Sequence, residues 1–365
     1  MGQRSNARGL DLNRDNMKLD AAEGRALARV LQDFDPDVLV DLHTTNGTKH
    51  AYHLTYAPPL HPDTDPGIVD ELRGQWLPWV TNTVRERSGW EFFHYGNIPG
   101  TWGMKGEQGW YTFDHRPRFT TNYVGLRNRF GILSEAYSYA SFEDRIRAHG
   151  LFVEALVDYA SRNAGRLRTI VNHADESPAT GTEISLSAEL RRGDTITILM
   201  GEVREKRNPY SGQRMLVRGD AQVQERMPDY TTFQATRTAT VPAAYLVLNS
   251  EGETIERLRA HGIRTWTLGT GTSLEVQAFT ADSVQTSERE YQRRHPAALF
   301  GSWSDETRDL PAETVVVPTD QPLGRLAALL LEPRSDDGLA AWAVLEVGED
   351  MVYPVLRTDR VPVEE

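Results

Sequence analysis

Hydrophobic residues recur at helical and strand spacing through the first 160 residues, and this pattern predicts alternating helices and strands. Residues 20–34 are expected to form an amphipathic helix, with Asp20 as its N-cap and Glu23 three residues later, as in a capping box. The apolar stripe of this helix consists of Leu27, Val30, Leu31 and Phe34. Asp-Pro-Asp ends the helix, and the apolar run "VLVDLH" at 38–43 follows as a predicted buried strand.

A second apolar run, "RFGILSEAY" at 129–137, predicts another core strand. A further helix is expected from Ser141, with Asp144 at its third position. A helix that leads into a near-continuously apolar strand is typical of an α/β unit, so we expect an α/β fold with a mixed sheet flanked by helices. The stretch 48–128 is rich in aromatic residues and glycine but poorly periodic, which is typical of active-site loops.

The pattern changes in a polar segment near residues 163–182. We expect a catalytic domain at 1–165, a linker at 166–182 and a β-rich C-terminal region of unknown role at 183–365. Strands are predicted at 182–190, 194–203, 213–219, 243–248 and 273–281. Helices are predicted at 252–263 and, after a strand and a proline-containing turn, within 313–333.

Composition narrows the classes of function. The chain has 40 basic and 52 acidic residues and a net charge of -12, which argues against a nucleic-acid-binding protein because phosphate binding needs a basic surface. The absence of cysteine excludes disulfides, thiolate catalysis and cysteine-zinc sites. No apolar run approaches the roughly 18 residues of a membrane span, and no signal peptide is visible after Met1. The compartment stays open.

Both predicted core strands end in residues that suit catalysis. His43 ends one strand and Glu135 lies at the end of the other. In open α/β sheets, sites form at the carboxyl ends of strands, so these two side chains are expected to meet in one cleft. A histidine with a carboxylate suits metal-assisted hydrolysis, in which the metal polarises a carbonyl and the carboxylate activates water. The alternative is a hydrogen-bonded structural histidine and a solvated glutamate.

A third candidate element lies near the start of the chain, where Asn13 and Arg14 follow a short apolar run. The arginine side chain presents a planar fork of donors that suits a carboxylate, and the neighbouring asparagine adds an amide donor. Taken alone, the pair would equally fit the end of a strand with a surface salt bridge.

Three segments together resemble, in this order, the carboxypeptidase A-like zinc carboxypeptidase family. They are "GLDLNRDNMKLD" at 9–20, "DLHTTNG" at 41–47 and "TNYVGLRNRFGILSEAYSY" at 121–139. The resemblance covers roughly residues 1 to 160 and implies the fold of that family with its first strands missing.

The resemblance also implies a role for each candidate residue. Asn13 and Arg14 would bind the C-terminal carboxylate of a peptide or protein substrate, His43 would ligate one zinc ion, and Glu135 would be the general base for the attacking water. The implied activity is zinc-dependent hydrolysis of C-terminal peptide bonds.

The sequence departs from the family in two respects. Tyr123 is the candidate for the tyrosine that contacts the substrate, but its spacing to the base is shorter than usual, and Tyr111 is the fallback. The family's His-x-x-Glu pair, which supplies two more zinc ligands, lies upstream of the Asn-Arg motif, and no such pair precedes it here. His173 and Glu176 form a His-x-x-Glu string, but in the predicted linker, which would mount a metal site poorly.

The missing ligands favour an N-terminally truncated sequence over a degenerate relative that has lost zinc. One imidazole falls short of the three protein ligands of a catalytic zinc, so this chain alone is expected to bind zinc weakly and to hydrolyse little. The alternatives are a non-catalytic protein that binds peptide carboxylates, an amidase of the same family, and a serine hydrolase that uses Ser134. The last lacks a Gly-x-Ser-x-Gly elbow, and Ser134 should face away from Glu135 across the strand.

Overall fold

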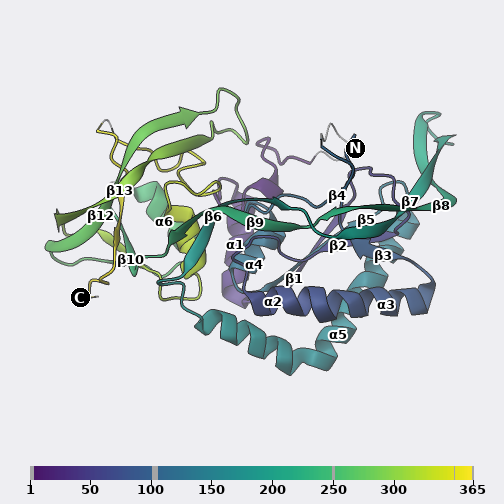
Figure 1. Ribbon diagram of the computed structural model, residues 1–365, viewed down its shortest axis with the longest axis horizontal. Helices are drawn as coiled ribbons and strands as arrows, with labels where there is room; N and C mark the ends of the chain where they lie inside the picture. Colours follow the sequence, from purple (N-terminus) through teal and green to yellow (C-terminus); the bar gives the residue numbers. More distant parts are fainter. Residues whose placement is uncertain (1–3, 101–105, 249–250, 349, 364–365) are drawn as a thin grey trace.

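The computed structural model describes residues 4–100, 106–248, 251–348 and 350–363. Its architecture is mixed α/β, as the sequence predicts, with helices beside β-sheets. Figure 1 shows the first sheet and its helices toward the right and a second sheet toward the left. The long strands β6 (Glu183–Arg191) and β9 (Thr232–Thr240) lie between the two.

The first sheet has four strands in the order β1-β5-β2-β3. Strand β1 (Val38–Thr44) runs parallel to β5 (Phe130–Ala136), and both strands lie within two residues of their predicted bounds. Strand β2 (Leu54–Ala57) is antiparallel to β5 and parallel to β3 (Phe92–His94). The sheet is therefore mixed, as expected, and its two predicted core strands are direct neighbours.

The prediction that β1 is fully buried is wrong. β1 is the edge strand of the sheet, and its residues are half-buried or exposed. The side chain of Leu42 is 50% exposed. An apolar sequence reports that a strand packs on one side, whereas the position of the strand within the sheet depends on which other segments pair with it.

Helices cover the first sheet and the segments around it. They are α1 (Ala22–Phe34), α2 (Pro66–Glu71), the π-helical turn η2 (Leu72–Trp76), α3 (Leu77–Ser88), α4 (Thr120–Leu126) and α5 (Phe142–Glu176). α1 departs from the prediction at its start: its N-cap is Ala21, which makes no side-chain cap, because the carboxylate of Asp20 pairs with arginines instead. In the predicted apolar stripe Leu31 is buried, but Val30 and Phe34 are 47% and 78% exposed.

Helix α5 begins as predicted and continues beyond its predicted end. The side chain of Ser141 caps it by accepting a hydrogen bond from the main-chain N of Asp144. The helix then runs for 35 residues to Glu176, so most of the segment predicted as a linker at 166–182 is helical. The segment is mostly polar, but Leu167, Val171 and Ala174 form a buried stripe along this part of the helix.

The C-terminal region, residues 183–363, is built mainly of strands, as predicted. Besides β6 and β9 they are β7 (Thr195–Arg207), β8 (Arg214–Tyr230), β10 (Ala244–Val247), β11 (Trp266–Thr267), β12 (Thr272–Thr286), β13 (Ala297–Leu310), β14 (Val315–Pro318) and β15 (Val355–Thr358). The helices α6 (Gly252–Ala260) and α7 (Gly324–Leu331) also belong to this region. A six-stranded sheet has the order β11-β14-β10-β15-β12-β13, and β8 pairs with β7 and with β4 (Trp110–Tyr111) from the N-terminal region.

The two regions share one hydrophobic core. Met17, Leu31 and Tyr123 of the N-terminal region belong to the same buried cluster as Tyr245 and Trp342 of the C-terminal region. A second buried cluster lies between the first sheet and helices α2, α3 and α5. The predicted domain boundaries stay a prediction. The shared cluster shows that residues of the C-terminal region cover part of the first region, in addition to its own helices.

Candidate functional site

The parallel pairing of β1 with β5 places His43 directly beside Glu135, because these residues are register partners. Asp41 lies two residues before His43 on the same strand, and alternate residues of a strand share one face. All three side chains line one cleft at the carboxyl ends of the two strands. This is the edge at which open α/β sheets form their sites.

The cleft holds a coupled histidine and carboxylate. His43 Nε2 lies 2.9 Å from Asp41 Oδ1. Burial by itself would lower the pKa of His43, but the neighbouring carboxylate of Asp41, together with the charge of Glu135, raises that pKa above its ordinary value. Burial raises the pKa of Glu135 to about 7, against the opposing charge of His43.

Glu135 has the features of a proton acceptor. Its Oε2 atom is buried and has no hydrogen-bond partner among the described residues. A carboxyl group whose pKa is near neutral can be ionised at working pH and still bind a proton readily, which is the balance that a general base needs.

Asn13 enters the same cleft from a short 3-10 helix, η1 (Leu12–Arg14). Asp11 begins this helix, and its side chain accepts a hydrogen bond of 3.1 Å from the main-chain N of Asn13. Asn13 Oδ1 accepts hydrogen bonds from Thr120, at 3.0 Å from the main-chain N and 3.1 Å from Oγ1. These bonds fix the amide plane and leave the Asn13 side-chain nitrogen without a partner in the described part of the chain.

Arg14 lines the same cleft. Its Cζ atom lies 3.9 Å from the centroid of the Phe119 ring, and one guanidinium nitrogen donates to the carbonyl of Asn13 at 2.5 Å. Within the described residues the guanidinium makes no ion pair with any carboxylate. A half-buried guanidinium held by an aromatic ring, with most of its donors unused, suits a carboxylate from outside the chain.

Arg14, His43 and Glu135 all line this one cleft. The cleft has a volume of about 350 Å³. Its other lining residues are Arg4, Asn13, Asp41, Thr44, Asn46, Tyr95, Asn97, Thr112, Phe113, Phe119, Thr121 and Leu133. The roles of the three residues stay predictions.

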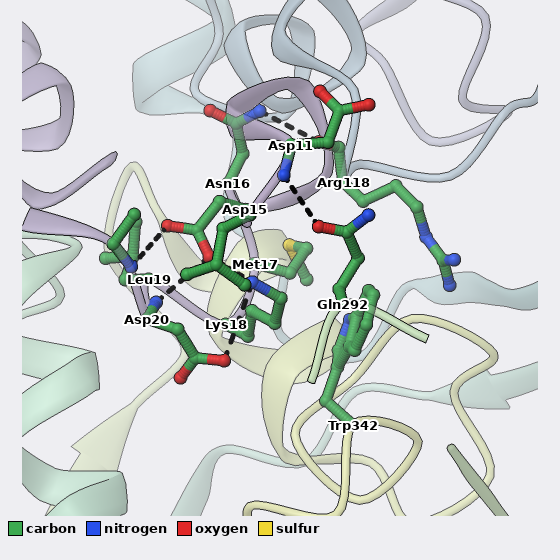
Figure 2. Close-up of polar contacts among 12 residues, drawn as sticks. Asp11, Asp15, Asn16, Met17, Lys18, Leu19, Asp20, Arg118, Gln292 and Trp342 are labelled. Atoms are coloured by element: carbon green, nitrogen blue, oxygen red, sulfur yellow. Dashed lines mark hydrogen bonds and ion pairs between the residues drawn. The ribbon is translucent and has the colours of Figure 1, made fainter. Parts of the chain in front are cut away.

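A buried ion-pair network holds the segment that follows the 3-10 helix (Figure 2). Lys18 is fully buried; it pairs with Asp15 and lies 3.5 Å from Asp20. Asp20 also pairs with Arg257 at 2.8 Å and Arg294 at 2.7 Å, both from the C-terminal region. Burial would raise the pKa of Asp20, but these cations hold it well below its ordinary value.

The described residues do not fit a catalytic zinc centre. Such a centre takes three protein ligands. Across residues 4–100, 106–248, 251–348 and 350–363, no group of three or more histidine, aspartate or glutamate side chains could hold a metal ion. Asp41 is moreover engaged with the Nε2 nitrogen of His43 itself. His43 as a zinc ligand therefore stays a prediction.

The chain resembles curated proteins over part of its length. It is 28% identical over 129 residues to a protein named carboxypeptidase 2 from Trichophyton tonsurans, which is 35% of this chain and 24% of that protein. Proteins of the same name from Trichophyton equinum and Trichophyton rubrum are 28% and 25% identical over 127 residues. The chain has a distant likeness to carboxypeptidases.

That likeness is partial. The match spans about a quarter of the length of these curated relatives. No family model matches the chain, and no solved structure matches it. The comparisons thus support a carboxypeptidase-like relationship, while membership of the carboxypeptidase A-like zinc family stays a prediction.

Neither candidate tyrosine lines the cleft. Tyr123 is 1% exposed in the shared core, where its hydroxyl lies 2.9 Å from His261 Nδ1 and accepts a hydrogen bond from Arg127 at 3.2 Å. The ring of Tyr111 stacks on Tyr230, with centroids 4.4 Å apart. Tyr123 lies within α4, whose residues 121–126 are all buried, so its hydroxyl bonds inside the protein.

Ser134 is placed as the alternation of the strand predicts, on the opposite face from Glu135. It is fully buried, and its hydroxyl lies 3.0 Å from His149 Nδ1. The other nitrogen of His149 lies 3.0 Å from the carbonyl oxygen of His43 instead of a carboxylate. Ser134 on β5 is thus connected through His149 to the main chain of β1, which is a structural contact. Because no carboxylate contacts His149 among the described residues, the geometry gives no support to a serine hydrolase.

His173 and Glu176 lie at the end of α5 and not in an irregular linker. Helical spacing places them near one face of α5. The prediction that they lie in an irregular linker is therefore wrong. Both residues are nevertheless exposed, and neither lines the cleft. They belong to no group in the described chain that could hold a metal.

Sequence reasoning missed two residues of the site. Asp41 precedes His43 by two positions, so strand alternation could have placed it in the cleft. Phe119, which supports Arg14, comes from a loop more than 100 residues away. Only the folded chain brings such a residue to the cleft.

Proposed function

We propose that this chain binds the free carboxyl terminus of a peptide or protein in its cleft and acts as a carboxypeptidase-like hydrolase. The observation that carries this proposal is the half-buried guanidinium of Arg14, which lines the cleft and pairs with no carboxylate of the described chain. Asn13 would add its unpaired amide nitrogen to the grip on the substrate carboxylate.

Glu135 would accept the proton of the attacking water as the water oxygen bonds to the scissile carbonyl carbon. It would then pass that proton to the leaving amine as the carbon–nitrogen bond breaks. Its pKa of about 7 suits both transfers, because the same group must bind and release a proton near neutral pH. The fungal proteins with which the chain shares partial identity carry the name carboxypeptidase, which supports this class of reaction.

A second candidate function is recognition of peptide carboxylates without hydrolysis. It is favoured by the lack of three grouped metal ligands in the described residues, since His43 is the single predicted zinc ligand and Glu135 serves as the base. We therefore expect slow turnover by this chain alone. Mass spectrometry of peptides incubated with the chain separates the two functions, because only hydrolysis removes a C-terminal residue.

The test of both candidates is the binding of two peptides that differ only in their C-terminal group. Calorimetry should show tighter binding of the free acid than of the amide. Arg14→Lys should weaken binding of the free acid roughly 10- to 100-fold, because a point charge cannot reproduce the planar fork. The amide should be affected little.

Arg29→Lys is the matched control, because the side chain of Arg29 is exposed on α1 and pairs with Asp33. This variant should bind both peptides as the unaltered chain does. Equal affinity of the unaltered chain for acid and amide, or an unchanged preference in Arg14→Lys, would show that Arg14 does not recognise a carboxylate.

A further inference from the structure

A tight turn of the C-terminal region, residues 291–294, contacts the N-terminal segment. The main chains of Tyr291 and Arg294 bond to each other in both directions, at 2.8 and 3.1 Å. Between them Gln292 and Arg293 have φ angles of 53° and 61°. Two-residue turns of this kind favour Asn-Gly, because positive φ is unfavourable for side chains such as those of glutamine and arginine.

Two side chains of this turn, those of Gln292 and Arg294, contact the N-terminal segment that carries Asn13 and Arg14. Gln292 Oε1 accepts a hydrogen bond of 2.8 Å from the main-chain N of Asp11, and Figure 2 shows the glutamine directed at that atom. Arg294 pairs with Asp20 at 2.7 Å. The ring of Tyr291 stacks on Trp342, with centroids 5.8 Å apart and planes 16° apart. Strained residues persist where surrounding contacts hold them, and here the contact of Gln292 with Asp11 leads toward the cleft.

A short chain of hydrogen bonds connects Gln292 to the cleft. Gln292 fixes the main chain of Asp11, the Asp11 side chain fixes the main-chain N of Asn13 at 3.1 Å, and Asn13 Oδ1 is fixed by Thr120. Asp11 is thus held from one side by the C-terminal region and itself begins the 3-10 helix. The orientation of this helix decides where the guanidinium of Arg14 lies.

We propose that Gln292 is a positioning residue for carboxylate binding: it holds Asp11 so that Asn13 and Arg14 face the cleft. This role rests on the proposed function, since it presumes that Arg14 binds a substrate carboxylate. It also gives the C-terminal region a part in the site, although no residue described in that region lines the cleft.

The structure offers variants that separate positioning from stability. Gln292→Gly removes the acceptor for Asp11, but glycine adopts positive φ without strain, so the melting temperature should not fall. Gln292→Glu keeps an acceptor oxygen at the same reach. Arg293→Gly is the matched control, because it relieves the same strain at the neighbouring position and leaves the bond to Asp11 intact.

The experiment measures the affinity of each purified variant for the free-acid and amidated peptides, together with its melting temperature. Gln292→Gly should bind the free acid roughly tenfold more weakly, which corresponds to about 1.4 kcal/mol, with unchanged binding of the amide. Gln292→Glu should restore most of the preference, and Arg293→Gly should keep all of it. A merely structural role would instead change the melting temperature and affect both peptides alike.

The outcomes distinguish the two proposals. If the unaltered chain prefers the free acid and Gln292→Gly prefers it equally, the positioning role is wrong and the proposed function stands. If Gln292→Gly melts lower and loses both peptides, the turn is structural and the positioning role is again wrong. If the unaltered chain itself shows no preference, the proposed function fails and this inference fails with it.

Discussion

Arg14 and Glu135 are the two side chains of opposite charge that line the cleft without an ion pair in the described chain. Arg14 offers unused donors on one side, and Glu135 has an unpartnered oxygen and a raised pKa on the other. A peptide end supplies what each lacks: a carboxylate for the arginine and, one bond away, a carbonyl that water can attack.

The pKa of Glu135 makes a prediction about binding and pH. A peptide carboxylate is already ionised at pH 6, whereas Glu135 ionises near pH 7 and then repels it. We expect the affinity for a free-acid peptide to fall roughly tenfold between pH 6 and 8, a loss of about 1.4 kcal/mol. In Glu135→Gln this fall should be smaller, because the glutamine side chain carries no charge at either pH. Calorimetry at several pH values is the measurement; parallel curves for both proteins would argue against a shared cleft.

At the scale of single residues, strand-end patterns located His43 and Glu135 because the end of a strand is a local feature. The sequence could not predict which way the side chain of Tyr123 points, because that depends on a distant part of the chain. Its hydroxyl meets His261, which is 138 residues further along the chain. Nothing in the local sequence records that partner.

Among the elements, β1 is the one whose surroundings matter most to the site. It carries Asp41 and His43 into the cleft, yet it is an edge strand of the first sheet. Within the described residues its outer edge has no strand partner. An edge strand with exposed apolar residues invites pairing with other chains.

Leu42→Lys tests that consequence, because Leu42 is 50% exposed on β1 and a lysine on an edge strand opposes pairing. We expect less self-association of the variant, measured by sedimentation at increasing protein concentration, with little change in melting temperature. Val223→Lys, at a 61% exposed position of β8, is the control and should leave self-association as it was. Equal association of Leu42→Lys and the unaltered chain would show that the β1 edge is not the contact.

Element prediction succeeded where periodicity is strong and failed where composition misled. The strands β5, β6 and β10 lie within two residues of their predicted bounds. The predicted linker is largely helix because Leu167, Val171 and Ala174 are buried at helical spacing. The apolar spacing of these three residues is present in the sequence. The prediction of a linker rested instead on the polar residues around them.

Across the whole molecule, the two regions are joined by buried polar contacts as well as by a shared core. His261 of the C-terminal region lies 3.0 Å from the Met17 carbonyl oxygen and 2.9 Å from the Tyr123 hydroxyl. Burial lowers the pKa of His261 to about 3, which the bond to Met17 only partly opposes. The imidazole is therefore neutral in the folded chain, and it stays neutral as the pH falls toward 3.

This contact predicts a pH-dependent stability. Between pH 6.5 and about 3 the unfolded chain binds a proton at His261 that the folded chain does not bind, so stability is lost as the pH falls. His261→Gln should be less stable at pH 7 by about 1–2 kcal/mol, because one buried hydrogen bond is weakened. As the pH falls, the stability of this variant should decrease less steeply than that of the unaltered chain. The two slopes should differ by about 1.4 kcal/mol per pH unit. Urea unfolding from pH 4 to 7 measures both slopes; identical slopes would exclude His261 as an acid-sensitive contact.

The central claim is that the Arg14 cleft receives a peptide carboxylate, and a crystal structure of the chain with a free-acid peptide tests it most directly. We predict that the terminal carboxylate lies against the Arg14 guanidinium and the Asn13 side-chain nitrogen, with the last peptide bond beside Glu135. A peptide bound elsewhere, or bound in this cleft by its amino end or its middle, would contradict the account.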